Sequence, residues 1–262
     1  MILVSQTDKY QPLPFFPSLL YFGVPAALMA VGFYWLMPLL IAGGMLPYYA
    51  YILGLGIPLM LMLVGSILYP RFEGLEINWS VLRERYRLNP LGKSGWLWSL
   101  GALLVGPVIG FFAFSRLSDL LRGMGLIKIP VSVPDFISPD VIGDPNQIYD
   151  AAVGGLIGNW PFFLVMVVLF VINILGEELW WRGVVLPRQE LAFGKWAWVI
   201  HGLLWTLFHA YKWWDLLSLL PISLALSFVA SKKKNTTAGI LIHGVTNGIA
   251  LVPLFFSVLG WV

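Results

Sequence analysis

The stretch Ala151–Gly183 reads AAVGGLIGNWPFFLVMVVLFVINILGEELWWRG, an uncharged run that ends in two adjacent carboxylates and an arginine. One membrane-spanning helix needs about 20 apolar residues, so this run is long enough to cross a bilayer. On insertion scales, each charge near the bilayer centre costs roughly 2.5–3.5 kcal/mol. Glu177, Glu178 and Arg182 therefore need either partners or a chemical role.

The rest of the chain is also apolar. Of its 262 residues, 59% are hydrophobic and 11% are charged, whereas soluble domains carry about 25% charged residues. Uncharged runs predict seven transmembrane helices, or eight if Ile127–Ile148 contributes one: two within Tyr10–Tyr69, then Trp96–Ser115, Ala151–Gly176, Trp196–Tyr211, Leu216–Ser231 and Asn235–Val262. We expect an all-α fold, a polytopic membrane helical bundle of seven to eight transmembrane helices. The runs that begin at Trp196 and Leu216 are short, so we expect them to be shallow or extended by flanking residues.

Basic residues gather in three connections: Arg71, Arg83, Arg85, Arg87 and Lys93; Arg188 and Lys195; and Lys232, Lys233 and Lys234. By the positive-inside rule these connections face the cytoplasm. Segment 116–159 has five aspartates against three basic residues and is expected on the other side. The prediction is an amino terminus inside and a carboxyl terminus outside. No cleavable signal peptide is expected, since only Lys9 precedes the first apolar run.

Two function classes are disfavoured by composition. The net charge of +3 comes from scattered basic residues, which argues against a nucleic-acid partner. The absence of cysteine excludes disulfides, thiolate metal sites and a cysteine nucleophile. Ionisable residues are distributed unevenly along the chain. The predicted membrane spans of residues 1–158 contain almost none, whereas residues 159–262 contain all three histidines and the Glu-Glu-Arg cluster. We predict N-terminal transmembrane helices and loops at 1–158 and a catalytic helical core at 159–262, within one integral membrane domain.

The carboxylates are expected to have different roles. Glu178 and Arg182 stand four residues apart, so they share one helix face and can pair. Glu177 is turned about 100° away and is free to face a cavity. The alternative is a cluster at a helix end whose charged groups snorkel to the membrane surface.

Three further polar side chains are expected at the same depth. Measured from the cytoplasmic helix ends at 1.5 Å per residue, Glu177 and His209 lie roughly 20 Å deep, and His243 and Asn247 roughly 12 and 18 Å deep. They could meet in one cavity, reached from the cytoplasmic side. Taken singly, His209 or His201 is more often a packing residue, and His243 with Asn247 an interhelical hydrogen bond.

Together these groups suit hydrolysis by activated water. Glu177 would accept a proton from water, His209 would share it, and His243 and Asn247 would donate to the oxyanion. Zinc is the competing interpretation, because two histidines and a glutamate are also a ligand set. The HExxH spacing is absent, but separate helices could still assemble such a site. A proton-linked transporter is less favoured, because no pseudo-symmetric halves are visible.

The order of these motifs resembles a known family. Glu177-Glu178-x-x-x-Arg182-Gly183, then an aromatic-x-x-x-His at Trp205 and His209, then His243-x-x-x-Asn247 are similar to the CPBP family, the CAAX proteases and bacteriocin-processing membrane proteins that include Rce1-type endopeptidases. The resemblance covers about Asn159–Val262. Trp205 stands where the family usually has Phe, a change that affects pocket shape more than chemistry.

The resemblance implies an intramembrane glutamate endopeptidase with a cavity open to the cytosol. Glu177 and His209 would activate water, and His243 and Asn247 would form the oxyanion hole. Glu178 and Arg182 would be supporting residues, with Arg182 structural or facing a substrate carboxylate. The implied mechanism needs no metal or other cofactor. Substrates would be prenylated CAAX-type proteins or leader peptides, in a prokaryotic plasma membrane or a eukaryotic endoplasmic reticulum. The family also has members implicated in bacteriocin self-immunity and in scaffolding without proteolysis.

Overall fold

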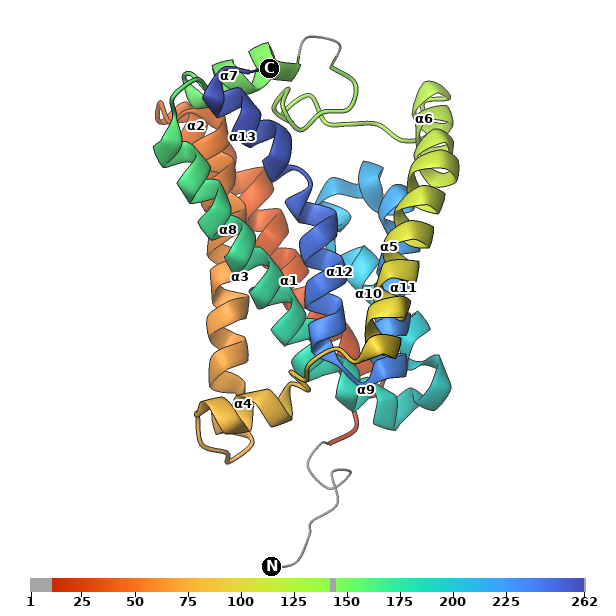
Figure 1. Cartoon of the computed structure of the whole chain (residues 1–262). Coiled ribbons are helices and arrows are strands. Elements are labelled where there is room, and N and C mark those ends of the chain that lie inside the picture. The colour runs from red at the N-terminus through yellow and green to blue at the C-terminus, as the bar shows by residue number, and fades with distance from the viewer. Residues whose placement is uncertain (1–10, 142–144, 262) are drawn as a thin grey trace, which may run out of the picture.

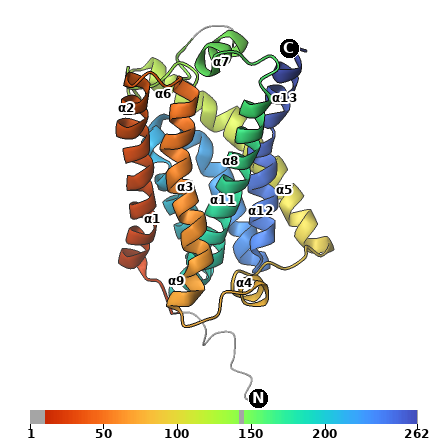
Figure 2. The same ribbon diagram turned by 90° about the vertical axis from the view of Figure 1, so that its left-hand side faces the viewer.

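The computed structural model describes residues 11–141 and 145–261, and all regular structure within these ranges is helical (Figures 1 and 2). The segment that contains Lys9 lies outside them. The helices are α1 (Phe15–Val31), η2 (Gly32–Leu36), α2 (Met37–Ala42), α3 (Pro47–Phe72), α4 (Trp79–Arg85), α5 (Lys93–Ile109), η3 (Gly110–Ser115), α6 (Arg116–Gly123), α7 (Pro145–Val153), α8 (Trp160–Glu178), η4 (Leu179–Val185), α9 (Leu186–Phe193), η5 (Gly194–Trp196), α10 (Ala197–Phe208), η6 (Ala210–Asp215), α11 (Leu216–Lys233), α12 (Thr236–Gly248) and α13 (Leu251–Leu259).

The prediction of an all-α membrane bundle is confirmed. In the described parts of the chain, six helical segments are long and apolar enough to cross a bilayer: Phe15–Ala42, Pro47–Phe72, Lys93–Gly123, Trp160–Phe208, Ala210–Lys233 and Thr236–Leu259. The proposed extra span around Ile127–Ile148 is not among them; its described residues hold turns and part of the short α7. This is an integral, multi-pass membrane protein.

Helix α8 begins where its sequence provides a cap. The side chain of Asn159 accepts a hydrogen bond from the backbone N–H of Phe162, and Pro161 occupies the first turn. Both features suit a helix start, because the first N–H groups of a helix have no partner within it. The helix then runs to Glu178 and widens into the π-helical segment η4, which carries Arg182. Single π-helical turns frequently accompany functional sites.

Of the two short runs, the one that begins at Leu216 is extended by flanking residues to the candidate span Ala210–Lys233, whereas the one that begins at Trp196 forms a short helix. Helix α10 has 12 residues, about 18 Å at 1.5 Å per residue, against a hydrocarbon core of about 30 Å. The turn that follows lies inside the protein, since Tyr211 is 7% exposed and Trp214 is 1% exposed. The hydroxyl of Tyr34 donates to the backbone oxygen of Tyr211 at 2.6 Å. The end of α10, and His209 with it, is therefore held within the bundle.

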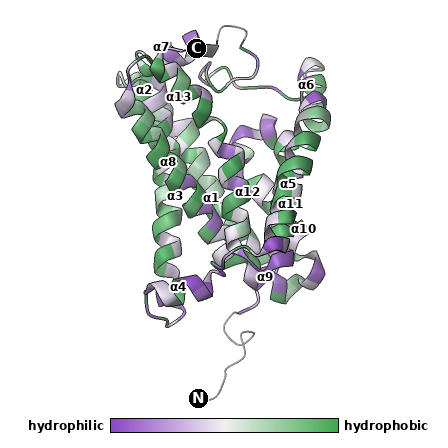
Figure 3. Ribbon diagram, in the orientation of Figure 1, coloured by the Kyte–Doolittle hydropathy of each residue, from purple (hydrophilic) through white to green (hydrophobic). Residues whose placement is uncertain are grey.

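The ends of the bundle differ in charge. Hydrophilic residues gather at the end formed by α4 and α9, while apolar residues follow the helices (Figure 3). There, Glu73 pairs with Arg85, and Glu190 pairs with both Arg87 and Lys234. Helices α7 and α13 lie at the opposite end (Figure 1). By the positive-inside rule the α4 and α9 end is expected in the cytoplasm.

Candidate active site

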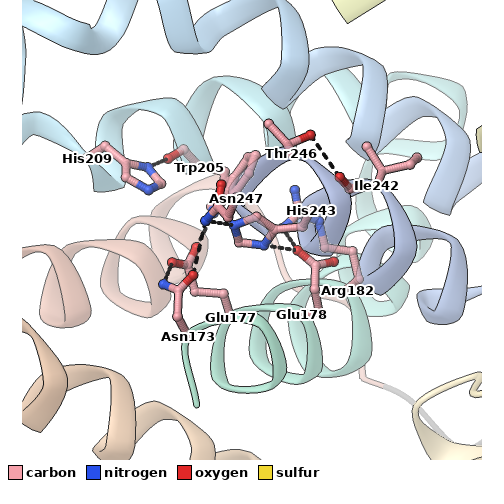
Figure 4. Close-up of polar contacts among 10 residues, drawn as sticks. All are labelled: Asn173, Glu177, Glu178, Arg182, Trp205, His209, Ile242, His243, Thr246 and Asn247. Carbon is pink, nitrogen blue, oxygen red and sulfur yellow. Dashed lines mark hydrogen bonds and ion pairs between the residues drawn. The ribbon is translucent and has the colours of Figure 1, made fainter. Parts of the chain in front are cut away.

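Charged and polar side chains lie together inside the bundle, where α8 with η4, α10 and α12 meet (Figure 4). The exposed fractions of Glu177, Glu178 and Arg182 are 1%, 0% and 1%. Such burial contradicts the snorkelling alternative, because a snorkelling charge stays in water. The charges must therefore be balanced within the protein.

Glu178 binds two partners with one oxygen. Its Oε1 accepts from Nη1 of Arg182 at 2.8 Å and from Nδ1 of His243 at 2.9 Å. The predicted pair of Glu178 and Arg182 is thus confirmed, and α12 is attached to it. The guanidinium carbon of Arg182 also lies 4.0 Å from the centre of the Trp205 ring, a contact worth about 2 kcal/mol when desolvated. Arg182 is thus held by an ion pair and a ring contact, while its Nε and Nη2 make no hydrogen bond among the described residues.

Two glycines make room for the carboxylates. A Cβ at Gly239 of α12 would lie 2.2 Å from Oε2 of Glu178. A Cβ at Gly176 would lie 2.8 Å from the backbone oxygen of Leu59 in α3. Both distances are below the 3.0 Å that Cβ contacts require. Without side chains at these positions, α12 and α3 close on the end of α8 from two sides.

Glu177 faces a cavity and is held by two donors. Its Oε1 accepts from Nδ2 of Asn173 at 2.9 Å, and its Oε2 accepts from Nε1 of Trp205 at 2.7 Å. A buried carboxylate needs such donors, because leaving it unpaired would cost several kcal/mol, on the order of the desolvation penalty of an ion. The tryptophan N–H is a group that phenylalanine lacks. The change from Phe to Trp205 therefore touches the chemistry of the base as well as the shape of the pocket.

His209 ends α10 and lines the same cavity. Its Nδ1 contacts the backbone oxygen of Trp205 at 2.9 Å. Since a carbonyl oxygen can only accept, Nδ1 carries the proton, and Nε2 of the neutral ring is an acceptor. Among the contacts of the described residues, no direct hydrogen bond joins His209 to Glu177. If Glu177 and His209 act together, a water molecule must lie between their side chains.

A chain of hydrogen bonds joins the two carboxylates. Nδ2 of Asn247 lies 3.1 Å from Nε2 of His243 and donates to Oδ1 of Asn173 at 3.2 Å. Asn173 in turn binds Glu177, and His243 binds Glu178 (Figure 4). Because Nδ1 of His243 donates to Glu178, its Nε2 accepts from Asn247 when the ring is neutral.

A cavity of about 870 Å³ contains Glu177, His209, His243 and Asn247 in its lining. The structure thus brings together the four side chains that the sequence depth predicts to meet. The lining also includes Tyr48 of α3, Tyr149 of α7 and residues of α13. Helices α7 and α13 and the start of α3 lie at the end opposite α4 and α9 (Figures 1 and 2). The cavity therefore extends from the polar cluster away from the basic connections.

Comparison with known proteins gives a family match over the residues that hold this site. Residues 159–249 match the family of type II CAAX prenyl endopeptidases, Rce1-like. This part of the chain is similar to the Rce1-like family. The match runs from the cap of α8 to the end of α12 and includes every predicted site residue. The similarity to this family supports the interpretation that the protein is a membrane protease.

One curated relative is the UPF0177 protein YbdI of Lactococcus lactis subsp. lactis (strain IL1403). It is 26% identical over 178 residues, which cover 68% of this chain and 82% of the relative. No solved structure gives a significant match.

The Rce1-like region does not present a zinc ligand set in this arrangement. No group of three or more His, Asp or Glu side chains that could hold a metal is found among the described residues. Both oxygens of Glu177 accept N–H groups, and Nδ1 of His243 is bound to Glu178.

His201 lies in the Rce1-like region but outside the cavity. It is fully buried, and its Nδ1 lies 2.6 Å from Oε1 of Gln189. This agrees with the interpretation of a packing residue. Asn173 is the residue that sequence reasoning missed. It stands four residues before Glu177 in an otherwise apolar run, which was a usable signal because residues four apart share a helix face.

Proposed function

We propose that this protein is an intramembrane endopeptidase of the glutamate type, which hydrolyses a peptide bond with water activated by Glu177 and His209. One observation carries the proposal most strongly. The carboxylate of Glu177 is buried and paired with N–H donors, yet it lines a cavity large enough for a peptide segment. Glu178, by contrast, is held by an ion pair with Arg182 and does not line the cavity.

The geometry supports a division of roles. Glu177 accepts a proton from water, and Nε2 of His209, which is free to accept, shares it. Asn247 is the exposed member of the hydrogen-bonded chain, so its Nδ2 can turn to the oxyanion. His243 orients Asn247, because its Nε2 accepts from Nδ2 of Asn247 while its Nδ1 donates to Glu178. Donors fixed before the reaction stabilise the developing charge, often as the largest single term.

The substrate class follows from the family and the lining. Prenylated C-terminal peptides of the CAAX type or leader peptides are the expected substrates, because most of the cavity wall is apolar and an apolar wall suits a peptide with a lipid or apolar residues. The sequence depth predicts entry from the cytoplasmic side. The direction of the cavity favours the other side, so we propose that substrate enters from the α7 and α13 end.

The test is cleavage by the purified protein. Prenylated and unprenylated C-terminal peptides are offered to the wild type, to Glu177→Gln and to Glu76→Gln. Glu76 is exposed at the basic end and gives a matched control for the substitution. We expect cleavage by the wild type and the control, and loss of at least about a thousandfold in Glu177→Gln. Equal cleavage by wild type and Glu177→Gln would remove Glu177 from the mechanism. A chelator arm separates the zinc mechanism, which predicts loss that added zinc restores.

The non-catalytic alternative is a scaffold or bacteriocin self-immunity protein that uses the polar cluster for packing. It predicts that Glu177→Gln keeps the cellular phenotype of the wild type. The proposed endopeptidase predicts loss of the phenotype at an unchanged protein level in the membrane.

A further inference from the structure

Lys212 is a cation in the wall of the active-site cavity. It lies in η6, the turn between α10 and α11, at backbone angles φ −122 and ψ 64 that interrupt the helix. Its backbone N–H donates to the backbone oxygen of His209 at 2.9 Å. Of the described residues that line the cavity, it is the single lysine or arginine. The break in the helix thus places a positive charge beside the proposed catalytic histidine.

Tyr211 lies alongside both side chains. Nζ of Lys212 is 5.8 Å from the centre of the Tyr211 ring, and the His209 ring is 6.3 Å from it on a nearly parallel plane. An extended peptide advances about 3.3 Å per residue. A group bound by Lys212 would therefore lie a few peptide residues from the bond presented to His209 and Glu177.

The ammonium group has capacity for another partner. Among the described residues its ion pair is with Oδ2 of Asp215 at 3.6 Å, and the side chain of Asp215 is 44% exposed. A well-formed charge-assisted hydrogen bond is shorter, about 2.7–2.9 Å, and an ammonium group carries three donors. A loosely paired charge in an apolar wall raises the free energy of the folded protein, so a residue that carries one is commonly functional. Arg182, the candidate that the resemblance offers for a substrate carboxylate, does not line the cavity.

We propose that Lys212 binds a carboxylate of the peptide substrate and so sets which peptide bond lies at Glu177. The proposal rests on the proposed endopeptidase function. A carboxylate fits better than a phosphate, because Asp215 stands beside Lys212 and repels a doubly charged anion. The carboxylate can be the carboxyl terminus of the peptide or an acidic side chain near it.

The test measures binding, so that it does not depend on turnover. The full-length Glu177→Gln protein in detergent is titrated with an N-acetylated hexapeptide of Leu and Ala that ends in a free carboxylate, and with the same peptide ending in an amide. We expect the acid to bind about tenfold more tightly than the amide, as hydrogen bonds to charged groups imply. In Lys212→Met the ratio of the two dissociation constants should fall to about one. Lys212→Arg should retain most of the preference.

Matched variants separate this role from a structural one. Lys93→Met makes the same change at the exposed start of α5 and should leave the ratio unchanged. Asp215→Asn removes the competing carboxylate and should raise the ratio. An amide peptide with an aspartate at its last position would regain binding if the recognised carboxylate is a side chain. A ratio near one before Lys212 is changed, or a preference that survives Lys212→Met, would overturn the proposal. Cleavage with no carboxylate preference would refute this inference alone, and carboxylate binding without cleavage would refute the endopeptidase function alone.

Discussion

Helix α10 carries His201 within it and His209 at its C-terminal end, and the two histidines lie in contrasting environments. His201 is fully buried, contacts Gln189 through Nδ1 and packs its ring edge against Phe22. His209 has one nitrogen fixed by a backbone oxygen and lies in the wall of a cavity that also contains Glu177. Both are polar groups in an apolar bundle, so polarity at depth does not distinguish a catalytic residue from a packing residue. Contact with the cavity does distinguish them.

The largest difference should appear when each histidine is replaced by glutamine. His209→Gln should lower the rate of peptide cleavage by about 10²–10⁴ and leave thermal unfolding almost unchanged, because it removes a proton acceptor from the cavity. His201→Gln should lower the unfolding temperature and leave the rate per folded molecule unchanged. Cleavage kinetics and unfolding in the same detergent measure both. Comparable rate losses in the two variants would contradict the contrast.

The adjacent carboxylates show the same contrast one residue apart. Glu178→Gln leaves Arg182 buried without its ion-pair partner, and breaking a buried pair costs about 3–5 kcal/mol. We expect a clear fall in unfolding free energy for Glu178→Gln and a much smaller one for Glu177→Gln, whose oxygens accept only neutral N–H groups. Thermal unfolding measures the difference. A double variant, Glu178→Gln with Arg182→Met, should recover part of the loss, because it leaves no unpaired charge. No recovery would mean that the pair contributes little to stability.

Trp205 joins the packed and the catalytic groups, since it contacts the guanidinium of Arg182 with its ring and Glu177 with its N–H. Trp205→Phe keeps an aromatic ring but leaves a buried carboxylate oxygen without its donor, which costs about 1–3 kcal/mol. We expect reduced stability and an altered dependence of cleavage rate on pH. Trp98→Phe changes a tryptophan that lies outside the cavity and is the matched control. Identical pH profiles for wild type and Trp205→Phe would show that this donor does not affect the base.

Local patterns carried most of what the sequence could predict. The apolar runs predict the helices, because each run exceeds or approaches the thickness of a bilayer, and the spacing of Glu178 and Arg182 predicts their pair. Apolar runs and residue spacing could not predict contacts between different helices. The bonds from Trp205 to Glu177 and from Asn247 to Asn173 join different helices, and their geometry depends on how closely the helices approach at Gly176 and Gly239. The short length of α10 could be predicted from its short apolar run, but the buried turn that follows the helix could not. That turn places Lys212 in the cavity, a residue with no motif to mark it.

The smallest effect on the protein itself comes from a chemical label that tests from which side of the membrane the cavity beside His209 is accessible. The natural chain has no cysteine, so Thr246→Cys introduces a single thiol in the cavity wall of α12, and Lys93→Cys introduces one at the basic end. If the cavity opens at the α7 and α13 end, a small membrane-impermeant thiol reagent added to intact cells should modify Thr246→Cys and stop its cleavage activity. Lys93→Cys should react only after the membrane is permeabilised. If Thr246→Cys instead reacts only after permeabilisation, as Lys93→Cys does, the entrance lies on the cytoplasmic side, as the sequence depth predicts. Because Thr246 and His209 line the same cavity, the side from which Thr246→Cys reacts is also the side from which a substrate reaches His209.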